Sequence, residues 1–222
     1  DRNPDRFLGR VPREKLQMLA SKKVNVNKTG IILDYADGGT LVELLAKQRS
    51  LDLRAVFQIS TECAKALQCL HERLQLVHFD LKPENIFLHN NRVKIGDFGF
   101  TLPIGEKRSG VGTRGYIAPE LIRSEWDKVD YLAHPAADIW ALGCTFAELS
   151  GRANWYKWCS KMSYTEWSQI TDGELDLVKN AFFPNRNDFH FDYIIDNCLQ
   201  LSPEKRFSAA KIVQICDDYL SL

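Results

Sequence analysis

Two acids, a lysine and an asparagine lie close together in the stretch LVHFDLKPENIFL, residues 76–88. The stretch begins and ends with apolar residues, which predicts short strands on either side of the polar ones. A further acid, Asp97, follows in the triplet DFG. Side chains of these types can neutralise phosphate charge, hold a hard divalent cation and place a hydroxyl in line, as phosphoryl transfer requires. The alternative is a surface ion pair between Asp80 and Lys82 in an ordinary turn.

Three more motifs lie downstream, and the order of all five carries a family resemblance. HFDLKPEN at 78–85 and DFG at 97–99 are followed by GTRGYIAPE at 112–120, DIWALG at 138–143 and LSPEKRFSA at 201–209. In this order they resemble the serine/threonine protein kinases, in which a lysine stands two residues after the catalytic aspartate. The resemblance covers about residues 31–220. It implies a protein-kinase-like α+β fold with a mainly helical C-terminal lobe and a truncated N-terminal lobe.

The resemblance gives separate roles to the polar residues of the first stretch. Asp80 would accept or orient the proton of the substrate hydroxyl, and Lys82 would lie against the transferred phosphate. Asn85 and Asp97 would hold Mg²⁺, which prefers oxygen ligands. The expected reaction is transfer of the γ-phosphoryl group of ATP to serine or threonine hydroxyls of a protein. The expected cofactors are therefore ATP and Mg²⁺.

Other positions match kinase residues that support the site. The acid at Asp138 holds the backbone of the catalytic loop in the family, and an acid in an apolar helix is costly to bury unless it is hydrogen-bonded. Glu120 and Arg206 are expected to form a partly buried ion pair that fixes the activation segment. His78 and Phe98 are expected to have structural roles.

Three residues match positions that place the protein substrate. Thr113 matches a threonine that contacts the catalytic aspartate and lysine of serine/threonine kinases. Glu84 and Glu148 match carboxylates used by kinases that prefer basic peptides. Two alternatives stay open for these glutamates. They either select substrates with basic residues near the phosphorylated hydroxyl, or they are ordinary solvated side chains on a chain without net charge.

The segment LDYADGG, residues 33–39, resembles the hinge that binds adenine in kinases. The backbone of Asp34 and Ala36 would bond the base, Leu33 would take the gatekeeper position, and Phe87 would lie beneath the ring. These four residues are the expected ATP-binding set.

One position of the catalytic loop departs from many kinases. Phe79 precedes the catalytic aspartate where those kinases have arginine, so the resemblance is to the non-RD type. That arginine normally pairs with a phosphate on the activation loop. Because phenylalanine carries no charge, we expect Ser109, at the corresponding position of the loop, to be dispensable for activity.

The N-terminal part of the sequence lacks two marks of the small kinase lobe. Ahead of the hinge there is neither a glycine-rich G-x-G-x-x-G loop nor a V-A-I-K strand. If GIILDY is the fifth strand, four strands and a helix must fit within residues 1–29, although they need roughly 31 residues without turns. We expect residues 1–33 to be a remnant of the N-terminal lobe, with a short helix and the hinge strand, and residues 34–222 to form the C-terminal lobe.

Two functions stay open at this stage. The first is a serine/threonine kinase with a truncated chain, favoured by the presence together of Asp80, Lys82, Asn85 and Asp97. The second is a catalytically impaired pseudokinase or lobe-only decoy that binds kinases, substrates or regulators, favoured by the missing loop and lysine. Small-molecule phosphotransferases with a similar catalytic loop are disfavoured by the APE segment and the DIWALG motif.

The elements that position these residues follow from periodicity. Val56, Cys63 and Leu67 belong to one apolar stripe, which predicts a helix over 53–73. This helix leads into residues 76–88, which we call the catalytic stretch. Residues 85–89 and 92–98 are predicted to form a hairpin around Asn90 and Asn91. The glycine-punctuated residues 100–117 are predicted to form an ordered loop.

Downstream of residue 135 the pattern is helical. A nearly all-apolar run predicts a buried helix that stops at Gly151, and two amphipathic helices are predicted at 188–200 and 208–220. Ser208 is the expected N-cap of the last one. The aromatic segment 154–167 is either ordinary packing or a docking surface for a partner protein.

Composition limits the classes of partner. The chain has 222 residues, 45% of them apolar, and 29 basic residues balance 29 acidic ones. No long-range field therefore steers it toward nucleic acid or an anionic membrane, and we expect neither as a partner. There is no run of roughly 20 apolar residues that could span a bilayer, and the first residues lack a signal-peptide core. Six cysteines without a C-x-x-C pair are expected to be reduced, which suggests an intracellular protein of the cytoplasm or nucleus.

Overall fold

The computed structural model describes residues 35–48, 51–90, 92–108, 112–151, 157, 159, 161–182 and 189–222. Contacts divide the chain into two units, residues 1–35 and 36–222. The N-terminal helix and hinge strand expected within residues 1–33 lie outside the described residues. The fold described below is that of the second unit.

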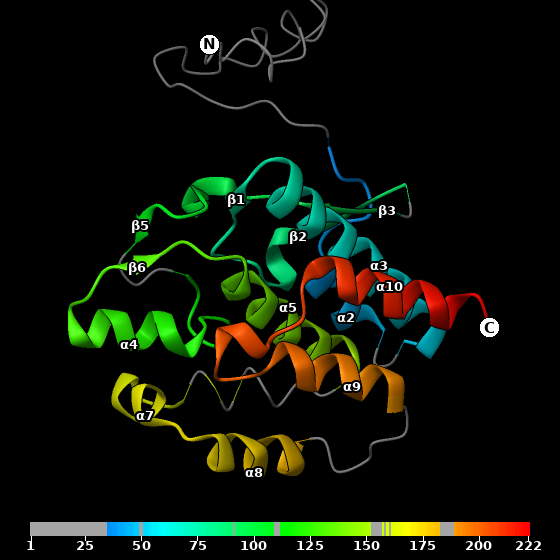
Figure 1. The fold of residues 1–222 in the computed structure, drawn as a ribbon. Coiled ribbons are helices and arrows are strands. Elements are labelled where there is room, and N and C mark those ends of the chain that lie inside the picture. The colour runs from blue at the N-terminus through cyan, green and yellow to red at the C-terminus, as the bar shows by residue number, and fades with distance from the viewer. Residues whose placement is uncertain are drawn as a thin grey trace, which may run out of the picture. The chain divides into compact units, whose positions relative to one another are not determined.

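Helices α3 and α5 run through the core of this unit (Figure 1). Helix α3 spans Leu53–Gln68 and continues as the π-helical turn η2, Cys69–Arg73, and helix α5 spans Ala136–Leu149. Helix α10, Ala209–Leu220, packs along α3, and helix α9, Phe189–Cys198, packs on α5. The four long helices predicted from periodicity are thus confirmed, although the end of the first one is π-helical.

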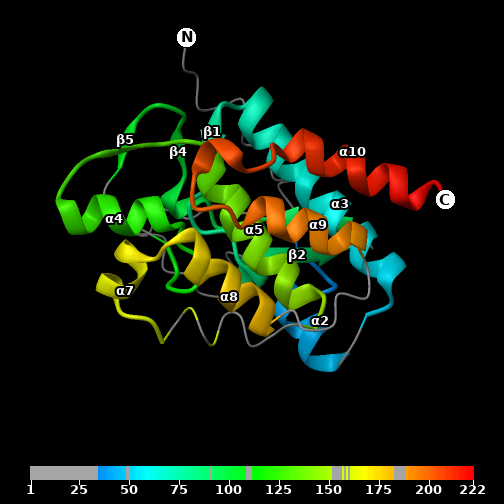
Figure 2. The same cartoon turned by 60° about the horizontal axis from the view of Figure 1, so that its bottom comes forward.

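Shorter helices flank these four. Helix α2 spans Leu41–Lys47, α4 spans Pro119–Asp127, α7 spans Tyr164–Gln169 and α8 spans Asp172–Phe182. Helix α7 packs against α4, and the two are neighbours in Figure 2. The described residues also form three 3₁₀ turns: η3 at Pro83–Asn85, η4 at Phe98–Phe100 and η5 at Pro203–Lys205.

The described strands are short and pair two by two, always antiparallel. Strand β1, Leu76–Val77, pairs with β4, Leu102–Pro103, and β5, Lys107–Arg108, pairs with β6, Tyr131–Leu132. Strands β2, Ile86–His89, and β3, Arg92–Ile95, form the predicted hairpin, with Ile86 opposite Ile95. The second strand ends before Gly96, earlier than predicted, because Asp97 adopts a left-handed conformation that ends the extended run. The loop predicted at 100–117 contains β4 and β5.

Side-chain caps explain where several helices begin. The Asp52 carboxylate accepts from the Ala55 N–H at 2.7 Å, and the Ser208 hydroxyl accepts from the Lys211 N–H at 3.2 Å, as predicted for the last helix. Thr40 and Glu43 form a capping box at α2. After α5, Gly151 takes a φ of 80°, a conformation that glycine adopts at low cost.

The core is apolar and contains most of the cysteines. All six cysteines are free thiols; five are buried and Cys69 is exposed. Burial raises the pKa of the Cys63 thiol to about 12, so this side chain stays protonated and behaves as a small apolar group.

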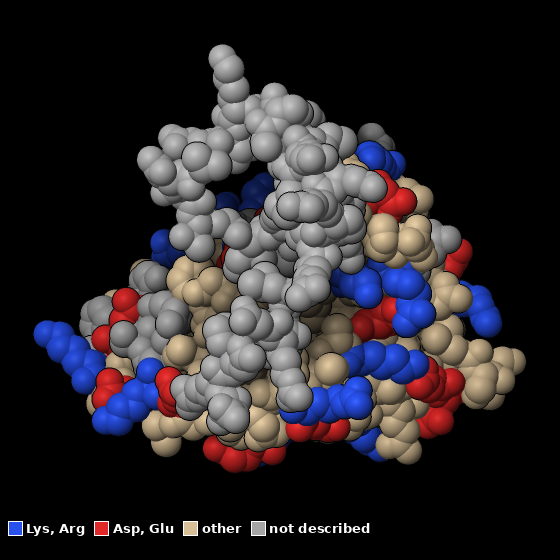
Figure 3. Space-filling view, turned by 90° about the horizontal axis from the view of Figure 1, so that it is seen from above, with Lys and Arg blue, Asp and Glu red and all other residues tan. Residues whose placement is uncertain are grey.

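Basic and acidic side chains alternate over the described part of the face seen in Figure 3, as expected for a chain in which both are equally frequent. Within the described ranges, no helix has the length and apolar character needed to cross a membrane.

Gly143 of α5 provides a test of the core packing. A Cβ atom at this position would lie 2.6 Å from Cys198 Cβ and 2.9 Å from Leu199 Cδ2. We expect Gly143→Ala to lower the free energy of unfolding by about 1–3 kcal/mol, because α9 must move away from α5. Urea denaturation measures the change. Gly173→Ala in α8 is the matched control, since no atom lies within 4 Å of its added Cβ, and a similar loss there would contradict this account.

Candidate active site

The carboxylate of Asp80 lies at the centre of a network of charge-assisted hydrogen bonds. Its Oδ1 accepts from the Thr113 hydroxyl at 2.7 Å. Its Oδ2 accepts from Lys82 Nζ at 2.8 Å and from Asn85 Nδ2 at 3.1 Å. Lys82 Nζ also donates to Thr113 Oγ1 at 2.5 Å. The structure therefore brings together four of the residues singled out in the sequence, with only 4% of Asp80 exposed.

Asp138 of α5 holds the backbone that precedes Asp80. Its Oδ2 accepts from the His78 N–H and its Oδ1 from the Phe79 N–H, both at 2.8 Å. A third contact is made by His71, whose Nε2 lies 2.8 Å from Asp138 Oδ2. The buried carboxylate is thus fully hydrogen-bonded, which is the condition for placing it in an apolar helix.

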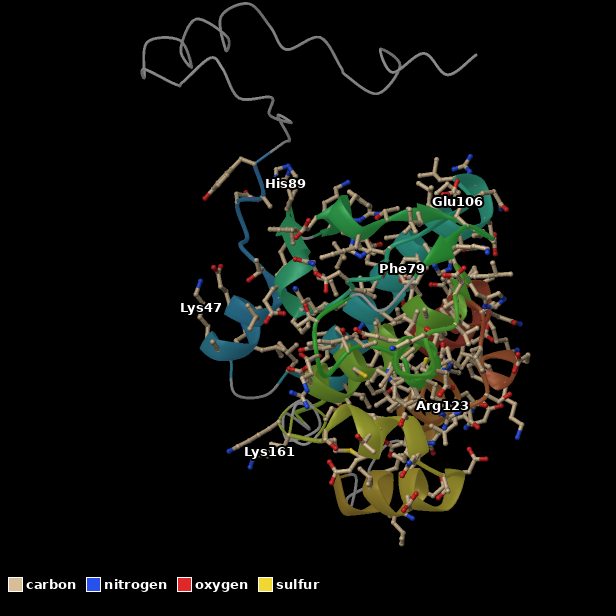
Figure 4. The ribbon with its side chains drawn as sticks, turned by 90° about the vertical axis from the view of Figure 1, so that its left-hand side faces the viewer. Lys47, Phe79, His89, Glu106, Arg123 and Lys161 are labelled. Atoms are coloured by element: carbon tan, nitrogen blue, oxygen red, sulfur yellow. The ribbon has the colours of Figure 1, made fainter. Side chains whose placement is uncertain are left out.

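Phe79 adopts an unusual backbone conformation that these bonds maintain. Its φ is 67°, a region costly for a bulky residue, and its side chain is buried in the core. Figure 4 shows Phe79 inside the unit, whereas His89 lies at its edge. Gly112 approaches from the activation segment with a φ of 120°, and a Cβ there would lie 2.7 Å from the Phe79 carbonyl oxygen. Only glycine fits this contact, which places Thr113 next to Asp80.

His78 has a defined tautomer in this arrangement. Its Nδ1 accepts from the Asp80 N–H at 3.2 Å, so the ring proton is on Nε2, which donates to the Gly96 carbonyl oxygen at 3.0 Å. The ring also meets Phe98 edge to face, with centroids 5.3 Å apart. His78 therefore joins the catalytic stretch to the DFG stretch and has no free nitrogen for proton transfer.

Asn85 belongs to this network, and Asp97 follows Gly96, whose N–H donates to the Asn85 carbonyl oxygen at 2.9 Å. Asp97 is exposed, with a φ of 59°, and its Oδ1 accepts a long bond of 3.4 Å from the Gly99 N–H. Asn85 uses its Nδ2 to donate to the Asp80 carbonyl and carboxylate, and these bonds leave its Oδ1 for another partner.

This donor set fits Mg²⁺ that arrives with phosphates. Within the described ranges, no cluster of three or more histidines, cysteines or acids is arranged to hold a metal by itself. Mg²⁺ is usually held by one or two carboxylates together with water and substrate phosphates. One carboxylate and one amide oxygen therefore suit a nucleotide-bound Mg²⁺ and not an independent metal centre.

The segment after the expected hinge runs beside strand β2. Gly38 N–H donates to the Leu88 carbonyl at 2.9 Å, and Leu88 N–H donates to the Gly39 carbonyl at 2.8 Å. Of the expected ATP-binding residues, Ala36 and Phe87 are described, whereas Leu33 and Asp34 lie outside the described residues. Gly96, which sequence reasoning missed, lets the Phe87 ring approach, since a Cβ there would lie 2.8 Å from Phe87 Cε2.

Tyr116 and Glu148 form a second polar group. Tyr116 OH donates to Glu148 Oε1 at 2.5 Å. Burial raises the pKa of Glu148 to about 7, the bond from Tyr116 opposes this rise, and the charge of Glu84 adds to it. Burial also raises the pKa of Tyr116, so its hydroxyl remains a donor. The two glutamates singled out in the sequence are thus close enough to interact electrostatically.

The ion pair expected between Glu120 and Arg206 is present. Arg206 Nη1 and Nη2 each donate to one Glu120 oxygen at 2.6 Å, and Nη1 also donates to the Ala136 carbonyl at 2.9 Å. The guanidinium carbon lies 5.1 Å from the centre of the Trp140 ring. These contacts join the start of α4 to the start of α5 and to the turn before α10.

Asp138→Asn tests how strongly the catalytic stretch depends on this carboxylate. The new NH₂ group would face one of the two backbone N–H donors, so we expect the free energy of unfolding to fall by about 2–4 kcal/mol. Urea denaturation measures the loss. Asp130→Asn breaks an exposed pair with Lys107 and should cost less than about 1 kcal/mol; equal losses in both variants would contradict the assigned role.

The raised pKa of Glu148 predicts a pH dependence of stability. Its native pKa of about 7 exceeds the ordinary value of 4.5, so the native state binds more protons between these values. The stability that this group contributes is complete below the ordinary pKa and is lost as the pH rises through about 7. Relative to Glu148→Gln, the free energy of unfolding should fall by about 1–3 kcal/mol from acidic to mildly alkaline pH. Glu125→Gln, on the exposed side of α4, should leave the pH profile unchanged, and a profile unaltered by Glu148→Gln would count against burial of this carboxyl.

Comparisons with known proteins agree with the motifs. The family profile described as the protein kinase domain matches residues 15–216. Mitogen-activated protein kinase kinase kinase 4 of Homo sapiens is 29% identical over 204 residues, which cover 85% of this chain and 12% of that protein. Cyclin-dependent kinase-like 1 of Caenorhabditis elegans is 30% identical over 215 residues, which cover 84% of this chain and 59% of that protein.

A third relative carries the serine/threonine description in its name. Serine/threonine-protein kinase PDK1 of Cryptococcus neoformans var. grubii is 30% identical over 186 residues, which cover 79% of this chain and 14% of that protein. The chain spans less than two thirds of each of these three relatives. The profile match over most of the chain, together with the mainly helical fold and its few short strands, shows that this chain belongs to the eukaryotic-type protein kinase family.

Proposed function

We propose that this chain is a serine/threonine protein kinase of the non-RD type that transfers the γ-phosphoryl group of ATP to hydroxyls of a protein substrate. The observation that carries the proposal is the bonding at Asp80. A threonine hydroxyl donates to its Oδ1 at 2.7 Å, while the Lys82 ammonium donates to its Oδ2 at 2.8 Å. The Asp80 carboxylate already accepts from the Thr113 hydroxyl beside the Lys82 ammonium, so it is suited to orient a substrate hydroxyl in the same way.

Asp80 supplies the place for the substrate proton. Its Oδ1 has a second lone pair beside the bond from Thr113, and a substrate hydroxyl would donate to it. As the hydroxyl oxygen bonds to phosphorus and the bond to the β-phosphate oxygen breaks, the hydroxyl proton passes to Asp80 and ADP leaves. Because the carboxylate is fixed by three donors, it needs little rearrangement during this step.

Lys82 supplies charge next to Asp80. Two of its three N–H groups point at Asp80 and Thr113, which leaves the third for an oxygen of the transferred phosphoryl group. The side chain is 18% exposed, so it is accessible from the site. Phosphoryl transfer depends mainly on positioning and charge stabilisation, which is what this lysine offers.

Asn85 and Asp97 would hold the magnesium ion of the nucleotide through oxygen. Bound Mg²⁺ neutralises the phosphate charge. Ala36 and Phe87 would contact the adenine, together with Leu33 and Asp34 of the preceding hinge. The support for this nucleotide site is the resemblance of LDYADGG to a kinase hinge and the pairing of residues 38–40 with strand β2.

For the protein substrate we propose a basic sequence context. The support is the electrostatic proximity of Glu84 and Glu148, of which Glu84 is exposed. A partner protein at the aromatic segment 154–167 stays a proposal; Trp167 is buried and its Nε1 donates to the Cys159 carbonyl at 3.1 Å, so this one aromatic serves packing. Free, mostly buried cysteines support a location in the cytoplasm or nucleus.

A second candidate is a binding module that engages kinases, substrates or regulators without transferring phosphate. It is favoured by the sequence ahead of the hinge, which has neither a glycine-rich loop nor a V-A-I-K strand. The non-RD assignment, with Phe79 in place of arginine, applies to both candidates; Ser109 lies outside the described residues.

Two variants separate these candidates. We expect Asp80→Asn to lower the rate of ADP release with a serine-containing basic peptide by at least about 100-fold while ATP binding persists. We expect Asp97→Ala to abolish Mg²⁺-dependent ATP binding in calorimetry. Asp218→Asn, exposed on α10, is the matched control and should change neither quantity. Wild-type protein that binds no ATP at millimolar concentrations would overturn the kinase proposal and favour the binding module.

A further inference from the structure

A cavity of about 500 Å³ lies beside His71, the histidine that contacts Asp138. Three segments line it: the turn after α3, the start of α5, and the η5 turn with the start of α10. Turn η5 contacts α5 directly and lies against it in both Figure 1 and Figure 2. The volume is in the range of small-molecule sites. None of the described residues proposed to bind nucleotide, metal or substrate lines this cavity.

The walls of the cavity combine apolar surface with one buried polar ring. Apolar side chains come from both sides of the cavity, namely Pro135, Ile139, Pro203 and Phe207. The polar ring is His71, whose side chain is only 7% exposed. This combination suits a ligand with an apolar body and one polar end.

His71 offers a hydrogen-bond acceptor to the cavity. Its Nε2 lies 2.8 Å from the Asp138 carboxylate, which can only accept, so Nε2 carries the proton. In the neutral ring, Nδ1 is then an acceptor. It has no hydrogen-bond partner among the described residues, although the ring is more than nine-tenths buried. A ligand in the cavity that carries an N–H or O–H donor could bond this nitrogen.

The charged groups around the cavity favour a cation. Glu72 and Glu204 both line it, and a hydrogen bond from Ser202 lowers the pKa of Glu204, so this carboxylate stays ionised. The positive charge of Arg206 is already paired with Glu120. His134 Nδ1 accepts from the Ala136 N–H at 3.2 Å. Among the described residues that line the cavity, Glu72 and Glu204 are the carboxylates, and Arg206, which is paired with Glu120, is the one arginine or lysine.

We propose that this cavity binds a small amphiphilic primary amine in its ammonium form. The ammonium group donates to His71 Nδ1, and the carboxylates of Glu72 and Glu204 supply the opposite charge. An aromatic or aliphatic body packs between Ile139 and Phe207. The match of charge, acceptor and apolar surface selects this class over neutral or anionic ligands.

The ligand would act on the catalytic stretch through a short chain of bonds. His71 contacts Asp138, and Asp138 accepts from the His78 and Phe79 N–H groups that precede Asp80. A ligand on Nδ1 restrains the His71 ring and thereby the carboxylate that fixes this backbone. The effect on phosphoryl transfer rests on the proposed function. The binding of the amine to the cavity does not.

Calorimetry with three matched probes tests the binding. We expect 4-phenylbutan-1-amine to bind the full chain with a dissociation constant below about 1 mM. The neutral 4-phenylbutan-1-ol and the anionic 4-phenylbutanoate should bind at least about tenfold more weakly, because neither carries the ammonium charge. Equal affinities for the three probes, or no binding of the amine, would overturn the proposal.

Variants of the two glutamates that line the cavity test whether the amine binds there. Glu72→Gln with Glu204→Gln should weaken amine binding at least about fivefold and leave alcohol binding unchanged, because the volume is kept and the charge is removed. Glu125→Gln on α4 is the matched control and should bind the amine like the wild type. Unaltered affinity in the double variant would place the amine elsewhere and refute the site.

A spectroscopic measurement tests the contact with His71. The ¹⁵N resonance of His71 Nδ1 should shift when the amine is added, and the Glu72→Gln, Glu204→Gln variant should need a higher amine concentration for the same shift. A bound amine that leaves this resonance unmoved would refute the contact. If the wild type releases ADP, the amine should also change the rate of ADP release, and the double variant should need more amine for the same change. If the wild type releases no ADP, only the proposed function fails, and calorimetry and the resonance still decide on the site.

Discussion

The carboxylate of Asp138 is completely buried inside an apolar helix, so both of its oxygens must find donors within the protein. They find them in the backbone N–H groups of His78 and Phe79 and in the His71 ring. A carboxylate placed there without these donors would cost several kcal/mol. The same bonds therefore serve two purposes. They satisfy the buried carboxylate, and they fix the backbone of the catalytic stretch.

The conformation of Phe79 shows what these bonds achieve. A bulky residue with a positive φ costs free energy, and such a residue persists only where its surroundings hold it. Asp138 holds its N–H, and its side chain is buried in the core, while Gly112 lies against its carbonyl oxygen. The backbone then turns so that Asp80 meets Thr113, Lys82 and Asn85. The buried Phe79 side chain thus makes this turn part of the core.

A second buried charge fixes the other side of the site. The Arg206 guanidinium, without exposed surface, is held by both Glu120 oxygens and by the carbonyl of Ala136 at the start of α5. Glu120 lies in the first turn of α4, and Ala136 lies two residues before Asp138. The Arg206 contacts and the Asp138 contacts are therefore both made at the start of α5. This end of α5 thus positions both the catalytic stretch and the segment before α4.

Much of the fold and of the candidate site followed from local sequence signals. The stripe in α3, the Asn90 turn between β2 and β3, and the cap at Ser208 each depend on residues near one another in the chain. The approach of Thr113 to Asp80 and the pair of Glu120 with Arg206 were expected only from the resemblance to kinases, because both contacts join residues far apart in the chain. The left-handed Asp97, which ends β3 early, and the π-helical end of α3 gave no such signal.

The sequence by itself determined which side chains could take part in the proposed phosphoryl transfer and which helices carry the core, because residue type and periodicity act over short distances. Only the tertiary structure decided that His71 contacts Asp138, that Gly96 makes room for the Phe87 ring, and that Tyr116 donates to Glu148. The two members of the first and last of these pairs are separated by 67 and 32 positions in the chain. Their proximity depends on how whole helices pack, and one sequence carries no local mark of that packing.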